Sequence, residues 1–265
     1  MTSVGFIGAG NMGFAIIKGM AGSGLRDVSL FAYDLKAEAL ERLKPFGVTP
    51  CGSENELIEK SDYVFLAVKP QQLDDLLDKA GKAFTDNKVI ISICAGITAE
   101  YLCSKTVPNA KVVLVMPNTP LLLGEGASAL SRNGNVSDGE FEFVKNIFSS
   151  CGKAAVIPRD KMKEIIAVNG SSPAFIYLFA KAFVDYAKSV NIDENAAKEL
   201  FAQSLIGSAK MITDSGYTID ELIKMVSSPG GTTLAGLDEL YKGDLSGTVA
   251  KACESCTRRA YELSK

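Results

Sequence analysis

The amino-acid sequence predicts two domains, a doubly wound α/β domain at residues 1–157 followed by an all-α domain at residues 158–265. Short apolar runs alternate with amphipathic segments in the first part, and this alternation is typical of a parallel sheet with helices on both faces. Beyond Pro158 strand-like runs cease and the apolar periodicity is helical. With 265 residues and 47% hydrophobic content, the chain is long enough for two cores.

The expected strands of the first domain are near-continuous runs of Val, Ile, Leu and Phe. Such runs are typical of strands that are buried on both faces. The strands are expected at residues 4–7, 28–33, 63–68, 89–93 and 112–116, with weaker candidates at 127–131 and 154–157. The helices between them are expected at residues 12–20, 37–43, 54–60, 71–80 and 138–150.

The second domain is predicted to contain helices only, at 161–168, 173–190, 194–215, 218–226, 234–241 and 245–263. Ser172 and Pro173 provide a start signal, as N-cap and first helical residue. The segment AFIYLFAKAFVDYA that follows is apolar on nearly every face, and such a helix must be buried on all sides. We therefore predict that this domain packs against a second subunit as a homodimer. An internal helix of a monomeric bundle is the alternative.

The charge balance argues against several classes of partner. Lys and Arg number 28 and Asp and Glu number 31, and no basic block favours nucleic acid or an anionic membrane. No apolar run is long enough to cross a bilayer and no leader precedes the first strand, so we expect a cytoplasmic protein. The six scattered cysteines, Cys253 and Cys256 among them, indicate free thiols rather than disulfides or a metal site.

The sequence contains no histidine. This excludes a Ser-His-Asp triad, a Cys-His pair and a histidine-ligated metal. Any chemistry must come from Lys, Tyr, Ser, Thr or carboxylate side chains, from backbone dipoles or from a bound cofactor.

A glycine-rich loop points to such a cofactor. In VGFIGAGNMGFAIIKGM, Gly8, Gly10 and Gly13 form G-x-G-x-x-G between a strand and a helix. Gly8 permits a tight turn, Gly10 lets the backbone approach a pyrophosphate, and Gly13 lets helix and strand pack closely. Together with Asp34, about 20 residues further on, this pattern predicts a Rossmann-type dinucleotide-binding domain.

Asp34 also bears on the choice between NADH and NADPH. A carboxylate at the end of the second strand accepts hydrogen bonds from the adenosine ribose, and it repels a 2′-phosphate about 4 Å away by up to about 4 kcal/mol. Lys36 lies two positions on and partly offsets that repulsion. The sequence therefore favours NADH over NADPH, with a plain turn residue as the alternative reading of Asp34.

Two further loops are expected at the carboxyl edge of the sheet, where ligands bind in this fold class. Pro70 cannot continue a central strand, so residues 68–70 lie past the strand end. Gly96, in CAGI, permits close backbone approach to a ligand. Asn118, in MPNTP, either donates its amide to the cofactor or braces its own loop.

The stretch SSPGGTT at residues 227–233 interrupts the helical domain. Pro229 ends one helix, Gly230 and Gly231 adopt angles closed to other residues, and the next helix starts near Thr232. The first N–H groups of that helix have no intrahelical partner and carry positive potential. The stretch therefore predicts a carboxylate-binding site made of backbone; a capped helix corner is the alternative.

Six segments taken together resemble the pyrroline-5-carboxylate reductases, from Gly5 to about Arg258. The resemblance implies NADPH- or NADH-dependent hydride transfer to the cyclic imine 1-pyrroline-5-carboxylate, giving L-proline. It also implies a Rossmann domain followed by a helical domain that interweaves with its twin, and dimers that in some members assemble into rings of five. The segments are GFIGAGNMG, FLAVKP, ISICAGIT, MPNTP, GSSPAF and SSPGGTT.

The resemblance also implies roles for individual residues. Thr233 reaches the ring nitrogen with its hydroxyl and is the catalytic candidate, while the substrate carboxylate is bound around Ser228, Gly230, Gly231 and Thr232. The implied cofactor-binding residues are Gly8, Ala9, Gly10, Asn11, Met12, Gly13, Asp34, Asn55, Ala67, Val68, Lys69, Pro70, Ala95, Gly96 and Asn118.

One residue departs from the pattern, and two other functions remain open. Asn169 stands before GSSP where many family members carry a small residue. A β-hydroxyacid dehydrogenase also joins a Rossmann domain to helices and uses a lysine with a later asparagine, and Lys161 or Lys163 with Asn169 is a partial match. A non-catalytic dinucleotide sensor is the other alternative.

Overall fold

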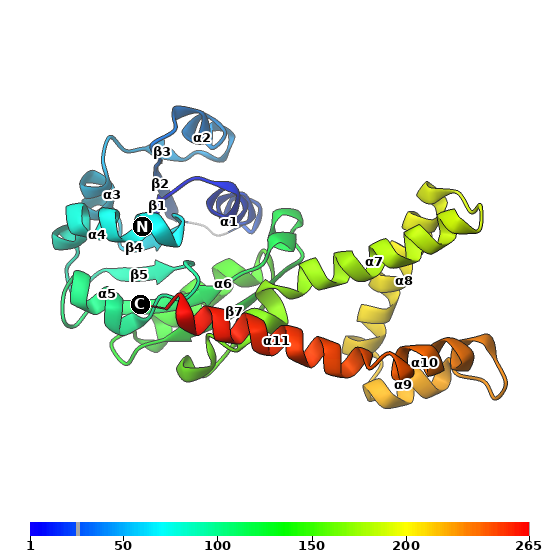
Figure 1. The fold of residues 1–265 in the computed structure, drawn as a ribbon. Helices are drawn as coiled ribbons and strands as arrows, with labels where there is room; N and C mark the ends of the chain where they lie inside the picture. The colour runs from blue at the N-terminus through cyan, green and yellow to red at the C-terminus, as the bar shows by residue number, and fades with distance from the viewer. Residues whose placement is uncertain (25–26, 265) are drawn as a thin grey trace. The chain divides into compact units, whose positions relative to one another are not determined.

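The structure is a computed structural model that describes residues 1–24 and 27–264. The chain forms two compact units, Met1–Pro173 with Ser255–Lys265 and Ala174–Glu254 (Figure 1). The first unit contains the sheet, and the second consists of helices and their connections. The predicted domain boundary between residues 157 and 158 was drawn from sequence patterns, whereas these units are defined by compactness, so the boundary stays a prediction.

The sheet has eight strands in the order β3-β2-β1-β4-β5-β6-β7-β8. Strand β1 pairs with both β2 and β4, so the direction of strand succession reverses at β1, and ligands of doubly wound folds bind at such a point. The strands are Thr2–Ile7 (β1), Val28–Tyr33 (β2), Thr49–Pro50 (β3), Tyr63–Leu66 (β4), Val89–Ser92 (β5), Lys111–Met116 (β6), Gly126–Arg132 (β7) and Gly152–Val156 (β8).

Strand β7 departs from the expected parallel sheet, because it pairs with β6 in the antiparallel sense. The other neighbouring strands of the described sheet are parallel. Between β6 and β7 the chain has room only for the short 3-10 segment η4 (Thr119–Leu123), whereas a parallel return needs a crossover of about a dozen residues or more. The chain therefore turns back directly beside β6.

Helices cover both faces of the sheet, as the strand composition predicts. Within β1, Phe6 belongs to the core beneath α1 and α6, while its neighbour Ile7 belongs to the core beneath α3, α4 and α5. This alternation is the period-2 geometry of a strand. The helices are Asn11–Gly22 (α1), Ala37–Glu41 (α2), Glu54–Lys60 (α3), Leu73–Ala80 (α4), Ala99–Lys105 (α5) and Asp138–Ser149 (α6).

Four local features differ from the sequence expectation. Strand β3 is too short, at two residues, to show a pattern, and α5 was not expected. The helix expected at 161–168 is instead the 3-10 turn η5 (Arg159–Lys161) and the π-helix η6 (Ile166–Gly170), closed by a hydrogen bond of 2.8 Å from Ser171 N to Ile166 O. Such π segments often mark functional sites. Ser172 is the first residue of the next helix rather than its N-cap.

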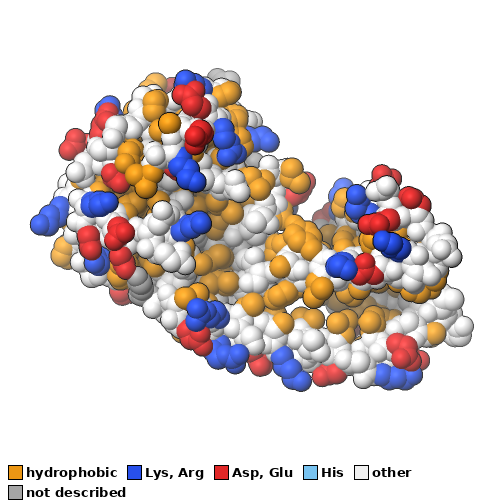
Figure 2. Space-filling view, turned by 45° about the horizontal axis from the view of Figure 1, so that its top comes forward, with side chains coloured by type: hydrophobic (Ala, Val, Ile, Leu, Met, Phe, Trp, Pro, Cys, Tyr) orange, Lys and Arg blue, Asp and Glu red, His pale blue; other side chains and the backbone are white. Residues whose placement is uncertain are grey.

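The helical unit lacks a closed core. Among residues 174–254, all of which the structure describes, Ala187 is the one buried residue. Figure 2 shows apolar side chains gathered on the surface of these helices. Among the described residues, no helix is long and apolar enough to cross a membrane. The helices are Ser172–Ser189 (α7), Glu194–Asp214 (α8), Ile219–Met225 (α9), Thr232–Lys242 (α10) and Leu245–Glu262 (α11), of which α11 returns to the sheet unit.

Candidate active site

The three loop glycines each meet a different steric requirement. Gly8 has φ +100°, and a Cβ there would lie 2.5 Å from the Ala67 carbonyl oxygen. A Cβ on Gly13 would lie 2.4 Å from the Gly8 carbonyl oxygen, so α1 starts tightly against the end of β1. At Gly10 a Cβ would meet nothing within 4 Å, so this position faces open space. This is the geometry expected when the backbone at Gly10 approaches a pyrophosphate.

The start of α1 provides hydrogen-bond donors at the same place. Gly10 is the N-cap and has no side chain to cap the helix, and the first intrahelical bond runs from Phe14 N to Gly10 O at 2.9 Å. The N–H groups of Asn11, Met12 and Gly13 have no partner among the described residues. Open donors and the helix dipole together favour an anion.

Asp34 is bound to the glycine loop. Its Oδ2 accepts a hydrogen bond of 2.7 Å from Ala9 N, and its Oδ1 accepts one of 2.9 Å from Lys36 N. Each carboxylate oxygen has a second lone pair, so hydroxyl donors can still bind. Asp34 therefore holds a fixed position at the end of β2, beside the loop.

The register of the parallel strands brings four predicted loops to one edge of the sheet. The last residues of β1, β4 and β5 lie side by side, and β6 is in register with β5. The loops that follow contain Gly8 after β1, residues 67–70 after β4, Ala95 and Gly96 after β5, and Asn118 after β6. Asn55 lies in the first turn of α3, whose N-cap is Ser53.

Cys94 ties two of these loops together. Its thiol donates to the Val68 carbonyl at 3.3 Å and to the Leu66 carbonyl at 3.5 Å. Burial raises the pKa of the Cys94 thiol to about 11, against the opposing effect of hydrogen bonds with Ser92 and Val68. Cys94 is therefore a neutral structural thiol and not a nucleophile at neutral pH. Gly96, two residues on, has φ +80°, a conformation that favours glycine.

Asn118 braces its own loop, one of the two roles that its sequence position suggested. Its Oδ1 accepts a hydrogen bond of 2.8 Å from Ala127 N, and its Nδ2 donates to the Asn169 carbonyl at 3.2 Å. The Asn169 side chain in turn donates to the carbonyls of Met116 at 2.7 Å and Ala127 at 3.0 Å. Sequence reasoning gave Asn169 no part in a reductase site and named it only for the dehydrogenase alternative; an amide amid the small and apolar residues of IIAVNG was the available signal.

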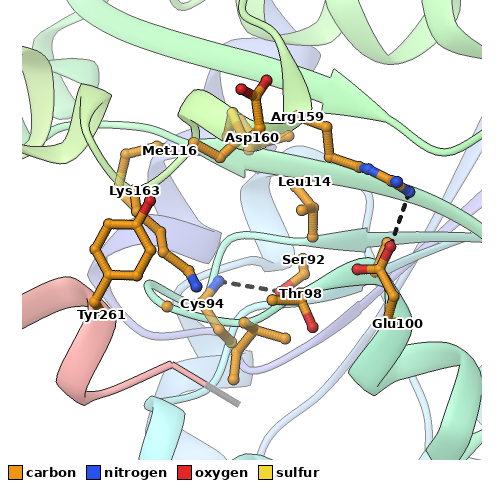
Figure 3. A pocket seen from close by; sticks show the side chains of 15 residues that line it. Ser92, Cys94, Thr98, Glu100, Leu114, Met116, Arg159, Asp160, Lys163 and Tyr261 are labelled. Atoms are coloured by element: carbon orange, nitrogen blue, oxygen red, sulfur yellow. Dashed lines mark hydrogen bonds and ion pairs between the residues drawn. The ribbon is translucent and has the colours of Figure 1, made fainter.

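A cavity of about 320 Å³ lies at the carboxyl ends of β5 and β6 (Figure 3). Met116, Lys163 and Tyr261 line it, and the first residues of α5 form another wall. The Lys163 Nζ donates to Ser264 Oγ at 3.0 Å and lies 4.4 Å from the Tyr261 ring centroid. Tyr261 OH donates to Glu164 Oε1 at 3.1 Å. Sequence reasoning missed this wall, because its parts are about a hundred residues apart.

The predicted carboxylate site at the start of α10 has an open helix end. Gly230 has φ +71°, and Gly231 is the N-cap without a side chain. The Gly231 N–H donates to the Ser228 carbonyl at 2.9 Å, so it closes the turn. The N–H groups of Thr232 and Thr233 have no partner among the described residues and are open to an anion. This stretch belongs to the helical unit, apart from the sheet-edge loops.

Comparison with known proteins covers both units. A family model described as pyrroline-5-carboxylate reductase dimerisation matches residues 159–263, and one described as NADP oxidoreductase, coenzyme F420-dependent, matches residues 3–96. The pyrroline-5-carboxylate reductase of Escherichia coli (strain K12) is 32% identical over 264 residues, covering 99% of this chain and 98% of that protein. That of Pisum sativum is 34% identical over 266 residues, covering 99% and 96%.

A solved structure agrees with these relatives. The crystal structure of Plasmodium falciparum pyrroline carboxylate reductase with NADP bound has a TM-score of 0.89 and 30% identity, covering 100% of this chain and 98% of that one. The sheet order, the glycine loop and these likenesses define a Rossmann-type oxidoreductase that uses NAD or NADP. Within that class, the chain belongs to the pyrroline-5-carboxylate reductase family.

Among the residues that the structure describes, no group of His, Cys, Asp or Glu is placed to hold a metal ion. Each unit instead has open backbone N–H groups at the start of one helix, α1 in the sheet unit and α10 in the helical unit. Both favour anions, since each combines unpaired donors with the positive end of a helix dipole. The residues present therefore fit a dinucleotide and a carboxylate.

Proposed function

We propose that this chain reduces 1-pyrroline-5-carboxylate to L-proline with NADH or NADPH, the last step of proline biosynthesis. The observation that carries the proposal is the open start of α10, a donor site for one carboxylate in a chain whose glycine loop suits a dinucleotide. The relatives support it, because they are named pyrroline-5-carboxylate reductases and the chain matches them over nearly their whole lengths.

The chain's own residues bind and orient the substrate. The carboxylate accepts hydrogen bonds from Thr232 N, Thr233 N and the Ser228 hydroxyl, while Gly230 and Gly231 shape the turn that exposes them. The Thr233 hydroxyl hydrogen-bonds the ring nitrogen. A reduced nicotinamide, when bound, would supply a hydride to the carbon of the protonated imine, whose C=N π electrons would become the lone pair of the secondary amine. An iminium accepts hydride without a strong acid, so orientation suffices in a protein that has no histidine.

The cofactor is held by the loops at the sheet edge. The open N–H groups at residues 11–13 would hold the pyrophosphate, and residues 67–70 and Gly96, at the carboxyl edge of the sheet, would hold the nicotinamide half. Asn55 faces the adenosine side, as its place on α3 after the edge strand β3 suggests. Asn118 braces the loop after β6 with its Oδ1 and one amide hydrogen, and its second amide hydrogen is left to donate to the nicotinamide half.

We further propose a preference for NADH. Asp34 cannot turn away from a 2′-phosphate without losing the bonds from Ala9 N and Lys36 N. Asp34→Ser should lower the ratio of kcat/KM for NADH to kcat/KM for NADPH about tenfold, since roughly 1.4 kcal/mol of repulsion is removed. Asp34→Asn keeps an acceptor without the charge and should move the ratio in the same direction. An unchanged ratio in both variants would make Asp34 a structural residue of the turn.

The helical unit supports a proposed homodimer. The family model that matches residues 159–263 is described by dimerisation, and the apolar faces of α7 and α8 are exposed in the single chain. Assembly of five dimers into a ring rests on the sequence resemblance alone. A cytoplasmic location fits the six cysteines, which are all free thiols.

One assay separates the proposed function from its rivals. Oxidation of NADH and NADPH is followed with 1-pyrroline-5-carboxylate, and reduction of NAD and NADP with a 3-hydroxy acid. Turnover of the hydroxy acid alone would favour the dehydrogenase, and turnover of neither would favour the sensor. The structure already weakens the dehydrogenase, because both amide hydrogens of Asn169 are donated to main-chain carbonyls.

Thr233→Val tests the local mechanism, since it keeps the shape and removes the hydroxyl. We expect kcat to fall about tenfold or more while the affinity for NADH stays within about twofold. Thr213→Val is the matched control, because its hydroxyl bonds the Ala209 carbonyl within α8. A Thr233→Val enzyme with unchanged kcat would remove this hydroxyl from the mechanism.

A further inference from the structure

Two asparagines form a closed network at the carboxyl end of β6. Asn118 bonds Ala127 N and the Asn169 carbonyl, and Asn169 bonds the Met116 and Ala127 carbonyls. The network thus joins the π-helix η6, which contains Asn169, to the end of β6 and the start of β7. Met116 is 53 residues and Ala127 is 42 residues from Asn169 in the sequence. The Asn118 and Asn169 side chains form these four hydrogen bonds, and all their partners are backbone groups.

Asn169 sits in this network with a fixed orientation. Its side chain is buried, at 9% exposure, and both amide hydrogens face carbonyl oxygens. A flipped amide would set oxygen against oxygen, so the two carbonyls determine which way the group points. Its Oδ1 is buried and has no partner among the described residues. An unsatisfied buried acceptor costs stability, so the residue is not explained by packing alone.

The network lies directly beside the nicotinamide end of the proposed site. Met116 lines the cavity at the ends of β5 and β6, and β5 leads into the loop that contains Gly96. The π-helix packs on the same residue, because a Cβ on Gly170 would lie 3.4 Å from the Met116 Sδ. The position of the loop after β6 therefore depends on where Asn169 holds Met116 and Ala127.

We propose that Asn169 is a positioning residue for hydride transfer: it fixes the loop after β6 so that the nicotinamide end of the cofactor is held in a reactive orientation. This inference rests on the proposed function. Asn169 touches neither cofactor nor substrate in it, and it acts through Met116 and Asn118. Loss of its two hydrogen bonds should shift the loop, while phosphate binding at the start of α1 is unaffected.

Asn133 provides a matched control at the opposite end of the same strand. It is also buried, its Nδ2 donates to the Ala110 carbonyl at 2.8 Å, and its Oδ1 accepts from Val112 N at 3.1 Å. Asn133 therefore braces the amino end of β6 with the same chemistry, far from the edge where ligands bind. Both asparagines should matter for stability, and only Asn169 should matter for turnover.

The experiment compares Asn169→Ser, Asn169→Asp and Asn133→Ser with the wild type. Both Asn169 variants should lower kcat with 1-pyrroline-5-carboxylate about tenfold or more, because a misplacement of about 1 Å costs up to about 100-fold. The KM for NADH should change less than about threefold, since the phosphates bind elsewhere. Asn169→Asp keeps the volume of the side chain and removes the paired donors. Asn133→Ser should lower the melting temperature and leave kcat within about twofold.

The fluorescence of bound NADH, which reports the surroundings of the nicotinamide, gives a readout that needs no turnover. It should change in both Asn169 variants and not in Asn133→Ser. A wild-type chain that binds NADH but does not reduce the imine would refute the proposed function and leave this readout to test Asn169. Unchanged kcat and emission in both Asn169 variants would overturn the inference, as would an equal loss of kcat in Asn133→Ser.

Discussion

Two pairs of stacked phenylalanines show how the two units differ. The ring centroids of Phe6 and Phe65 in the sheet unit are 4.3 Å apart, and those of Phe183 and Phe201 in the helical unit are also 4.3 Å apart. Yet Phe6 and Phe65 are fully buried, whereas Phe183 is 46% exposed. The same contact therefore lies in a completed core in one unit and at an uncovered surface in the other.

The difference teaches that the sheet unit folds around its own cores and the helical unit does not. Each large apolar side chain left in water forgoes about 1.5–3 kcal/mol of burial, and most of the exposed ones in the described chain lie in residues 174–254. The description of the family model, dimerisation, supports a second copy of these helices as the partner that covers the exposed apolar side chains. We expect the effects of substitutions in the helical unit on stability to depend on protein concentration. The effects of substitutions in the sheet unit should not.

The largest effect on activity is expected from a charge on the exposed face of α7. Leu178 is 69% exposed in the single chain, and Leu178→Glu would bury a carboxylate in the proposed dimer. The dissociation constant of the dimer should rise about 100-fold or more, for a cost of roughly 3 kcal/mol, and activity should fall with it. Light scattering coupled to size exclusion measures the assembly.

Lys188→Gln, in the last turn of the same helix, is the matched control. It alters charge without entering an apolar face and should leave the dimer intact. NADH binding by the sheet unit should survive in both variants. A Leu178→Glu chain that remains dimeric and active would show that this face of α7 is not part of the interface.

The next effect compares the two phenylalanine pairs directly. Phe65→Ala should lower the free energy of unfolding by about 3–5 kcal/mol, because it leaves a cavity between Phe6 and Phe148. Phe183→Ala should cost less at low protein concentration and more at high concentration, where the proposed dimer forms. Urea unfolding over a range of protein concentrations measures both. Equal, concentration-independent losses would show that the helical unit is complete by itself.

The smallest effect is expected from acid. Asp62 accepts hydrogen bonds of 2.9 Å from Ser3 N and 2.6 Å from Ser3 Oγ, which join β1 to the start of β4. Burial raises the pKa of Asp62, but the bonds from Ser3 and the charge of Lys88 outweigh it and the pKa is lowered. A lowered pKa stabilises the fold above the unfolded value of about 3.9, and this stability is lost as the pH falls through the folded value.

The helical unit offers the comparison for this acid effect. Glu221 also has a lowered pKa, through hydrogen bonds from Thr218, but it caps only the start of α9. Asp62→Asn should flatten the loss of unfolding free energy between about pH 5 and about pH 3, and Glu221→Gln should hardly change it. Urea unfolding at each pH measures the difference. An unchanged slope in Asp62→Asn would exclude Asp62 as a source of the acid sensitivity.

Local patterns predicted most of the sheet unit. The strands and the glycine loop were found because apolar runs and glycine spacing are local signals. The carbonyl that crowds Gly8 belongs to Ala67, after β4, and the sequence pattern did not reveal it. The antiparallel direction of β7 was missed, since strand composition does not encode direction and only the short connection after β6 decides it. The π-helix was missed because its i to i+5 bond leaves no distinct apolar period.

The candidate site was predicted less completely than the fold. Its loops were found because glycine and proline have strong local signals. The network around Asn169 was not, because its partners lie 42 and 53 residues away, and neither was the cavity wall at Tyr261, 97 residues from Glu164. Contacts of this kind depend on the register of the strands and on the return of α11 to the sheet unit. They cannot be predicted from the sequence of any single segment.

That return of α11 has a consequence for synthesis of the protein. Ser264 and Tyr261, which hold Lys163 beside the cavity, come after the whole helical unit in the chain. A nascent chain on the ribosome can thus form its glycine loop early, but it gains this wall only after the apolar helices have emerged. The wall beside Lys163 therefore depends on residues made after the helical unit, whereas the glycine loop does not.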